Sequence, residues 1–281
     1  MRPRVLEECI VVGGALKGDN FLAKSRDRNY TPHVTIYREL LDSGIEIVYM
    51  HDEDTDYMEG MNSEGIGIVN AALLVGDDEK AVKGKIKSTD GKIMRAALEC
   101  TDLRTCIQTL ISTDGGIKGH TLVGNSDTLY TIEMTSKHNP VINKVKDTSK
   151  TQVRTNHGLE HAGAGYTVDR KPDDYLSSKI RQATAEVQVA GAEDIGQIAP
   201  SLARQTFDPD SNYNMNRKTD NMSTTSQCAM NLSKRHFNFY FFPTHCEFNG
   251  VVDKTPEDYD PRVKINVYRY KTPGRKGLSI K

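Results

Sequence analysis

The stretch Cys9-Ile-Val-Val-Gly-Gly-Ala15, followed shortly by Asp19-Asn-Phe-Leu-Ala-Lys-Ser-Arg-Asp-Arg28, decides the fold of this chain. Two apolar runs joined by a glycine-rich turn predict a β-hairpin. The hairpin would bring Cys9 close to the charged residues 24–27 at the end of its second strand. Nearby cations lower the pKa of a thiol, which favours a reactive cysteine. Position alone also fits a buried core cysteine, because free cysteine is among the most buried residue types.

The segment before Cys9 is short and charged. It consists of eight residues, Met1-Arg-Pro-Arg-Val-Leu-Glu-Glu8. Its removal would leave Cys9 with a free α-amino group beside its own thiol. The unperturbed pKa of an α-amine is about 7.7–8.0, which suits a general base near neutral pH. One residue would then supply both the nucleophile and the base.

The composition is that of a globular protein. The 281 residues are 37% hydrophobic and 27% charged, with a net charge of −1, so the chain can form a core and lacks the basic balance of a nucleic-acid-binding protein. No apolar stretch is long enough to span a membrane, and the N-terminus lacks the apolar core of a signal peptide. The five cysteines have no paired spacing, which indicates reduced thiols in a cytoplasmic compartment. We expect neither nucleic acid nor a membrane as a partner.

Apolar periodicity predicts strands before, between and after two groups of helices. Besides the hairpin, strands are expected at residues 45–50, 66–74, 120–124, 128–134, 141–145, 151–155, 224–232, 236–242 and 264–270. The segments 141–145 and 151–155 are expected to pair in one sheet, and the aromatic segment 236–242 to pack in the core. Strands grouped in this way indicate an α+β fold with antiparallel sheets covered by helices, rather than a parallel βαβ sheet.

Amphipathic spacing predicts four helices. The first two cover residues 93–100 and 103–111, and Asp102 is the expected N-cap of the second. Asp173 or Asp174 is the expected N-cap of a third, and a weaker fourth covers residues 192–204. The apolar face of the third helix is expected to carry Leu176, Ile180, Ala183 and Val187.

Two asparagines lie where a strand could present an amide to a site. Asn70 interrupts the apolar run 66–74, and Asn156 lies in Thr155-Asn-His-Gly158, between a predicted strand and a glycine-rich loop. Asn156 could donate an N–H to a developing oxyanion, and one such donor is worth roughly 3–4 kcal/mol. The alternatives are an amide satisfied by the backbone at Asn70 and a turn-stabilising asparagine at Asn156.

The remaining motifs argue against metal and cofactor chemistry. His157-Gly-Leu-Glu-His161 matches the H-x-x-E-H string of zinc peptidases, but that string binds zinc on a helix, and its glycine and those that follow oppose one. The chain has neither a phosphate-binding glycine loop nor a dinucleotide fingerprint, so we expect no metal and no cofactor. Cys9, His157 and a downstream Asn also follow the order of papain-like peptidases, although Cys9 heads a strand and not a helix.

Six short segments carry a resemblance to a known superfamily. They are Cys9-Ile-Val-Val12, Phe21-Leu-Ala-Lys-Ser-Arg-Asp-Arg28, Gly60-Met-Asn-Ser-Glu-Gly-Ile-Gly-Ile68, Gly124-Asn-Ser-Asp-Thr-Leu-Tyr-Thr-Ile-Glu133, Arg154-Thr-Asn-His-Gly158 with Ala164-Gly-Tyr166, and Thr224-Thr-Ser-Gln227. In this order they resemble the N-terminal-nucleophile (Ntn) amidohydrolases. The branch they resemble contains the choloylglycine hydrolases, the penicillin-type acyltransferases and the secernin-like dipeptidases.

The resemblance implies a four-layer αββα fold and a reaction at a linear amide. Carried over by position, Cys9 is the nucleophile and its freed α-amine is the base. Asp27 would orient that amine. Lys24 takes the place of a cation that supports the thiolate, and Arg26 is a candidate for the same role.

The resemblance also implies two oxyanion groups. Asn156 matches the oxyanion-hole asparagine, and Asn70 is a looser match to a second polar group because its spacing from Gly65 differs. Two positions depart from the pattern: Ser25 stands where many members have Asn, and the arginine of the late aromatic strand has only Arg235 as a neighbour.

The leading hypothesis is a thiol-dependent amidohydrolase or acyltransferase. Residues 1–8 would form a propeptide-like segment, removed by self-cleavage or by another protease, and residues 9–281 a single domain. A small-molecule or peptide amide would acylate Cys9, and water or an amine would resolve the thioester. The alternatives are a non-catalytic binding or structural protein that keeps residues 1–8 and a papain-like peptidase that uses His157. Self-association into a homo-oligomer is a further expectation.

Overall fold

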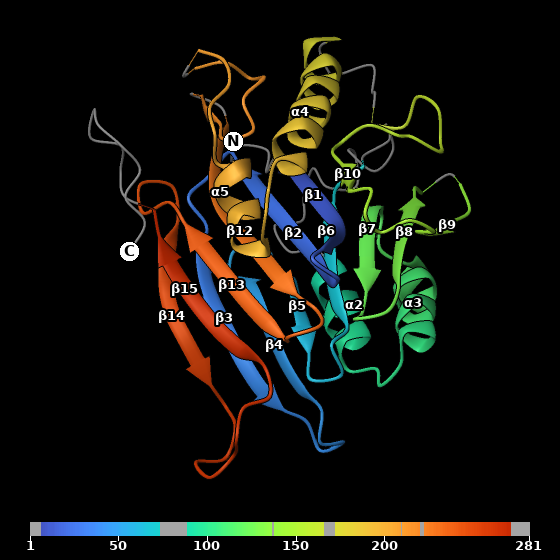
Figure 1. The fold of residues 1–281 in the computed structure, drawn as a ribbon, viewed down its shortest axis with the longest axis vertical. Helices are drawn as coiled ribbons and strands as arrows, with labels where there is room; N and C mark the ends of the chain where they lie inside the picture. The colour runs from blue at the N-terminus through green and yellow to red at the C-terminus, as the bar shows by residue number, and fades with distance from the viewer. Residues whose placement is uncertain are drawn as a thin grey trace.

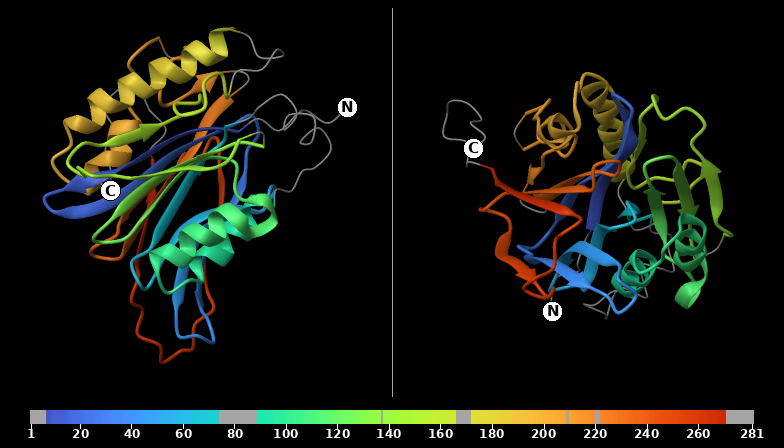
Figure 2. Two further views of the ribbon diagram at one scale, coloured as in Figure 1. Left: turned by 90° about the vertical axis from the view of Figure 1, so that its right-hand side faces the viewer. Right: turned by 60° about the horizontal axis from the view of Figure 1, so that its bottom comes forward.

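The N-terminal hairpin lies at the centre of one of two β-sheets that face each other. The structure is a computed structural model, and it describes residues 7–73, 89–136, 138–165, 172–208, 210–219 and 222–270. Helices cover the outer face of each sheet, so that the layers follow the order helix, sheet, sheet, helix (Figure 1, Figure 2). This arrangement confirms the α+β class predicted from the grouping of strands and helices.

The first sheet is built around the hairpin. Its strands follow the order β10 (Gln152–Arg154), β1 (Glu7–Leu16), β2 (Asp19–Arg28), β12 (Met222–Asn231), β13 (His236–Phe241) and β15 (Lys264–Arg269), and β11 (Lys218–Thr219) pairs with β12. All of these pairs are antiparallel except β13 with β15. The hairpin register places Cys9 opposite Arg26 and Glu8 opposite Asp27. Successive side chains point to opposite faces of a sheet, so the side chains of Cys9 and Glu8 lie on opposite faces.

The second sheet has the longer meander. Its strands follow the order β14 (Glu247–Asp253), β3 (His33–Leu40), β4 (Glu46–Asp52), β5 (Tyr57–Asn62), β6 (Gly67–Ala71), β7 (Gly119–Gly124), β8 (Leu129–Met134) and β9 (Val141–Lys144). Only β14 and β3 run parallel. The chain therefore leaves the first sheet after β13, adds β14 to the second sheet, and returns to add β15 to the first.

Helices from two parts of the chain form the outer layers (Figure 2). The second sheet is covered by α2 (Asp90–Leu98), α3 (Leu103–Ser112) and the short η1 (Thr113–Gly115), and the first by α4 (Pro172–Ala190), η2 (Ile195–Gln197) and α5 (Ile198–Leu202). Asp102 caps α3 as predicted, because its side chain accepts a hydrogen bond from the Thr105 N–H.

Three apolar layers follow from the alternation of side chains along the strands. Val11 and Leu22 face the second sheet and pack between the two sheets. Ile10 and Phe21, their neighbours in the sequence, face α4 and α5 on the other side. A third layer joins the second sheet to α2 and α3. The aromatic strand β13 contributes Phe237 to the layer between the sheets, which confirms its predicted place in the core.

Some predicted pairings and strands differ from the structure. The segments near 141–145 and 151–155 do not pair with each other, because β9 joins β8 in the second sheet and β10 joins β1 in the first. The sequence analysis also omitted β3, β5 and β14. Both β3 and β14 are partly exposed along much of their length, which weakens the apolar signal on which strand prediction depends.

The predicted buried face of the third helix is wrong. Leu176 and Val187 are 46% and 73% exposed, whereas Ser177, Ser178 and Arg181 are buried. The helix also begins at Pro172, so residues 173–174 lie in its first turn and do not precede it. The predicted fourth helix is divided into η2 and the short α5.

Residues 1–6, Leu74 and Tyr166 belong to predicted segments and lie outside the described residues. Within the described ranges, no helix has both the length and the apolar character needed to cross a lipid bilayer. The same part of the chain holds no cluster of three or more His, Cys, Asp or Glu side chains placed to bind a metal ion.

Candidate active site

Cys9 lies inside the molecule, near the start of β1. Its thiol faces the layer between the sheets, and the residue is only 2% exposed. Its backbone N–H donates a hydrogen bond of 3.1 Å to Oδ1 of Asn156. Asn156 follows β10, which pairs with β1 on the side away from β2. The strand order of the first sheet thus brings together a cysteine and an asparagine that are far apart in the sequence.

The cation beside the thiol is Arg28. Its Nη1 lies 3.7 Å from the Cys9 sulfur. Side chains alternate between the two faces of a strand, so Lys24 and Arg26 lie on the same face of β2 as Arg28. All three side chains are buried, so the hairpin directs a row of positive charge between the sheets.

The two cations predicted to support the thiolate contact acids of the second sheet. Lys24 Nζ lies 2.7 Å from Glu59 and donates a hydrogen bond of 2.9 Å to the hydroxyl of Tyr57. Arg26 lies 3.1 Å from Asp52. These ion pairs join the two sheets at the level of the hairpin end. Among the described contacts, that of Arg28 reaches the sulfur, and those of Lys24 and Arg26 do not.

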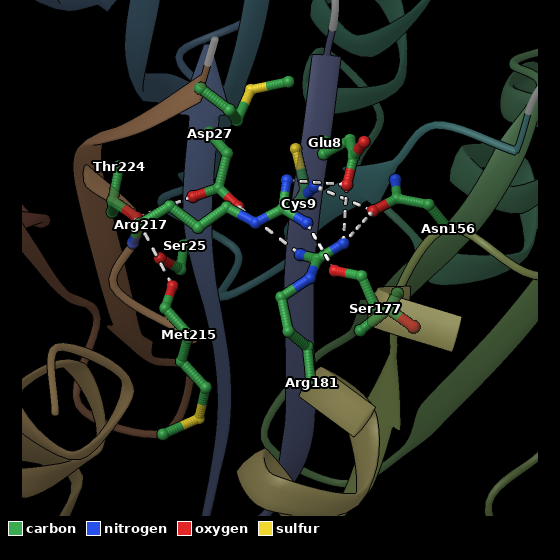
Figure 3. A network of polar contacts seen from close by, with 12 residues as sticks. Glu8, Cys9, Ser25, Asp27, Asn156, Ser177, Arg181, Met215, Arg217 and Thr224 are labelled. Carbon is green, nitrogen blue, oxygen red and sulfur yellow. Dashed lines mark hydrogen bonds and ion pairs between the residues drawn. The ribbon is translucent and has the colours of Figure 1, made fainter. Parts of the chain in front are cut away.

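Asp27 lies on the opposite face of β2, in a buried cluster with Glu8 and two arginines (Figure 3). Arg181 of α4 contacts both acids, at 2.7 Å from Glu8 and 3.4 Å from Asp27. Arg217, immediately before β11, lies 2.8 Å from Glu8 and 3.8 Å from Asp27. Thr224 donates a hydrogen bond of 2.7 Å to Asp27.

Burial and charge act against each other in this cluster. Burial raises the pKa of the Asp27 carboxyl, and Arg217 and Arg181 oppose that rise. Burial lowers the pKa of the Arg181 guanidinium to about 10, an effect to which the charge of Arg217 adds. Glu8 and Asp27 work in the other direction and favour the charged guanidinium. Arg181 therefore depends on these acids to remain charged at low cost in the interior.

Asn156 connects Cys9 to the cluster. Its Oδ1 accepts from the Cys9 N–H and also from Arg181, at 3.2 Å. Its Nδ2 donates to the carbonyl oxygen of Ala72 at 2.8 Å, and its backbone N–H donates to the hydroxyl of Ser178 on α4. Strand β1, helix α4 and the segment after β6 therefore fix the position of this amide.

Asn70 is directed elsewhere. Its Nδ2 donates to the Thr121 hydroxyl at 2.9 Å and to the Lys118 carbonyl at 3.3 Å. On β6 the neighbouring Val69 and Ala71 face the layer between the sheets, so the alternation turns Asn70 towards the helix side. The described contacts do not bring its amide to Cys9.

His157 is part of a buried hydrogen-bond network. Its Nδ1 lies 3.1 Å from the hydroxyl of Thr155 and 2.9 Å from that of Ser178. Burial lowers the pKa of His157 to about 4, with His120 adding to the effect. Within the described part of the chain, its contacts do not include Cys9. This is not the thiol–imidazole pair that a papain-like mechanism requires.

The loop after His157 is held by Glu133, at the end of β8. Glu133 accepts three backbone N–H groups, from Leu159, Glu160 and His161, at 2.9–3.0 Å. The H-x-x-E-H segment is thus a loop and not a helix. The loop supports the strand end that carries Asn156.

Three residues at this site were not selected from the sequence: Arg28, Arg181 and Arg217. Arg28 could have been found from the two-residue period of β2, which puts it on the face of Cys9. Arg181 was missed because the apolar residues of its helix predicted a buried face that does not include it. Arg217 lies outside any periodic segment and carried no signal.

Similarity between this chain and known proteins is found among solved structures. No protein-family model matches the chain, and no curated protein matches it. Among solved structures, penicillin V acylase from Agrobacterium tumefaciens is similar over 83% of this chain and 86% of its own. The identity is 12% and the TM-score is 0.43. Similarity at this level does not transfer an activity from that enzyme to this chain.

Proposed function

We propose that this protein is a thiol-dependent amide hydrolase or acyltransferase with Cys9 as its N-terminal nucleophile, and that it becomes active when residues 1–8 are removed. The observation that carries the proposal is the double contact of Cys9. Its nitrogen, which would become the α-amine, is hydrogen-bonded to Asn156, while its sulfur lies beside the cation of Arg28.

In the proposed reaction the α-amine of Cys9 takes the proton of the thiol. The sulfur attacks the carbonyl carbon of the amide, and a C–S bond forms. The C–N bond then breaks, and the amine leaves with the proton. Water, or an acceptor amine, attacks the thioester, releases the acid or the new amide, and restores the thiol.

The charges around Cys9 suit an amine that acts as a base. Arg28 contacts the sulfur of Cys9, and Arg181 contacts Asn156 Oδ1, the atom that also accepts the Cys9 N–H. Like charges disfavour protonation of an amine, so this surrounding favours its neutral, proton-accepting form. Asn156 Oδ1 would orient the amine by accepting one N–H. Asp27, which lies opposite Glu8 in the hairpin register, would offset part of the positive charge of Arg181 and Arg217.

Asn156 would also serve the oxyanion. Its Nδ2 now donates to the carbonyl of Ala72, so this role requires the amide to exchange that partner for the substrate oxygen. The loss of one oxyanion donor typically lowers the rate by about 10²–10³-fold. Lys24 and Arg26 would act from a distance, by fixing the hairpin end against Glu59 and Asp52.

Self-cleavage would use the same sulfur and the same oxyanion groups, but not the α-amine, because the cleavage itself releases that amine and the thiol proton passes to it. The Cys9 sulfur would attack the carbonyl carbon of Glu8, the Glu8–Cys9 C–N bond would break, and water would hydrolyse the resulting ester of the thiol. The product would be a chain of residues 9–281. Cleavage by a separate protease would give the same product without this step.

The test combines intact mass with activity. The purified protein should lose the mass of residues 1–8, on its own or after incubation with an extract of producing cells, and should then hydrolyse simple acyl anilides. Cys9→Ala should abolish the hydrolysis. Cys228→Ala is the matched control, since Cys228 is also a buried free thiol of the first sheet. Full activity of Cys9→Ala would exclude the proposal. A chain that keeps its first residues and cleaves no amide would be a binding protein.

A further inference from the structure

The carboxylate of Glu8 occupies a prepared anion site. Its oxygen Oε2 lies 2.7 Å from Nη2 of Arg181 and 2.8 Å from Nη1 of Arg217 (Figure 3). The two guanidinium groups approach the oxygen from different elements, α4 and the segment before β11. Both arginine side chains are almost completely buried. Hydrogen bonds to charged groups in such surroundings are among the strongest in proteins.

Other contacts hold the arginines in place independently of Glu8. Arg217 donates to the Ser177 hydroxyl at 2.6 Å and to the carbonyl of Asn212. Arg181 donates to Asn156 at 3.2 Å. The site would therefore keep its shape after Glu8 leaves.

Removal of residues 1–8 would change the charge of this cluster. At present two carboxylates, Glu8 and Asp27, face two guanidinium groups. Without Glu8 the two arginines would face Asp27 alone, and one buried positive charge would have no counter-charge in the cluster. A buried unpaired charge is costly, so the vacated position would favour an anion.

The position of Glu8 indicates that the acyl group of a substrate would carry the anion. Glu8 is the acyl residue of the Glu8–Cys9 bond, and its carboxylate is joined to the carbonyl carbon through the carbon atoms of a glutamate side chain. The thiol and the carboxylate lie on opposite faces of the first sheet. In the processed chain Cys9 would be the first residue of its strand. No backbone would then precede Cys9, so one acyl group could extend from the sulfur on one face of the sheet to the arginines on the other.

We propose that the pocket of Glu8 becomes the acyl-side subsite of the processed enzyme, and that the enzyme selects amides whose acyl group carries a carboxylate at the glutamate spacing, as glutaryl and α-glutamyl amides do. This inference rests on the proposed function. The acyl group would pass to the Cys9 sulfur as the amine leaves. Water would then release the dicarboxylic acid and restore the thiol.

The first experiment measures activity with two matched substrates. Glutaryl p-nitroanilide carries the carboxylate, and glutaramoyl p-nitroanilide replaces it with a neutral amide of the same shape. With protein whose mass shows the loss of residues 1–8, kcat/KM should be at least roughly 100-fold higher for the glutaryl compound. Equal values for the two compounds would overturn the subsite while leaving the amidase proposal intact.

Arginine variants connect this preference to the pocket. Arg217→Met should reduce the ratio of the two kcat/KM values to near one, and Arg217→Lys, which keeps the charge, should retain part of the ratio. Arg204→Met is the matched control, because Arg204 is exposed and contacts only Gln188 among the contacts described. A ratio that Arg217→Met does not change would exclude the assignment of this arginine.

A second experiment needs no catalysis. In full-length protein carrying Glu8→Ala and Cys9→Ala, millimolar propionate should replace the missing carboxylate and raise Tm, whereas propionamide should not. The added variant Arg217→Met should remove the effect. Absence of any Tm rise would overturn the anion site. A Tm rise in a protein that cleaves no amide would instead refute the proposed function and preserve the site.

Discussion

Arg28 Nη1 lies 3.7 Å from the sulfur of Cys9. The contact runs diagonally across the hairpin, because the register places Arg26 directly opposite Cys9. Arg26 is directed instead at Asp52 of the second sheet. Both arginines contact Asp52, Arg28 at 3.8 Å and Arg26 at 3.1 Å, but among the described contacts only Arg28 also reaches the thiol.

Arg28→Met should make the Cys9 thiol less reactive. The guanidinium can stabilise the negative charge that the sulfur gains as it reacts, and a hydrogen bond to a charged group is worth about 1.5 kcal/mol or more, so its loss should lower the rate of alkylation by iodoacetamide at pH 7 by roughly tenfold. The measurement is a time course of labelling at Cys9, followed by mass spectrometry of the digested protein. Arg28→Lys should recover most of the rate. If Arg28→Met is labelled as fast as the wild type, the arginine does not act on the thiol.

Lys24→Met should destabilise the fold strongly. It removes the contact of 2.7 Å and leaves the buried Glu59 with the longer contact of 3.9 Å to Arg26, and the removal of one member of a buried ion pair typically costs about 3–5 kcal/mol. Urea unfolding measures this loss. The double variant Lys24→Met/Glu59→Gln should recover a large part of it, because the buried carboxylate that lost its nearest cation is then neutral.

The matched control for this pair is Lys234→Met. Lys234 also lies close to a carboxylate, that of Asp19 at 2.6 Å, but its side chain is 61% exposed. Exposed pairs contribute at most about 1 kcal/mol. Equal losses at the two lysines would show that burial does not determine the strength of these ion pairs.

His157 should make stability depend on pH between about 4 and 6.5. Its pKa is about 4 in the folded protein and about 6.5 in an unfolded chain. Between these values the unfolded chain binds more protons, so the free energy of unfolding falls as pH falls, by up to about 1.4 kcal/mol per pH unit from this residue. His157→Gln should reduce that slope in urea titrations at several pH values.

His33 provides a control of opposite sign. It is exposed, and its contact with Asp54 raises its pKa. Its contribution to stability is therefore present at low pH and is lost as pH rises through the folded value. His33→Gln should weaken the protein at low pH and leave the slope due to His157 in place. If both substitutions change the slope in the same direction, the assignment is wrong.

Gly91→Ala should destabilise the contact of α2 with the second sheet. A Cβ at this position would lie 1.6 Å from the carbonyl oxygen of Asp56, so the helix would have to move. Overpacking of this kind usually costs about 1–3 kcal/mol, which thermal unfolding can measure. Gly191→Ala is the control, because its nearest neighbour would be 3.8 Å away, and surface changes usually stay within about 0.5 kcal/mol.

The parts of the fold that the sequence predicted have strong local signals. The hairpin, α3 with its Asp102 cap, and the aromatic strand β13 each combine an apolar period with a turn or cap residue. Strands β3 and β14 were missed because much of their length is partly exposed. Their position depends on pairing with distant strands, which no short window contains.

The polar site was predicted less completely, for a physical reason. Cys9, Asp27 and Asn156 each belong to a short segment with a recognisable sequence, so each could be predicted from that segment alone. Arg181 is buried because it meets Glu8 and Asp27, and such a partner-dependent burial has no apolar period. The stripe of α4 that contains Leu176 looked like the core face, although ion pairs determine which side of this helix turns inwards.

The two neighbours of β2 in the first sheet come from opposite ends of the chain, β1 at Glu7–Leu16 and β12 at Met222–Asn231. At a synthesis rate of about 5–20 residues per second, roughly 10–40 s pass between the two. Throughout that time a growing chain has Cys9 but lacks Thr224 and Arg217. The surroundings of the Glu8–Cys9 bond are thus complete only after β12 has been synthesised, so the self-cleavage proposed above would not take place in chains that stop before Arg217.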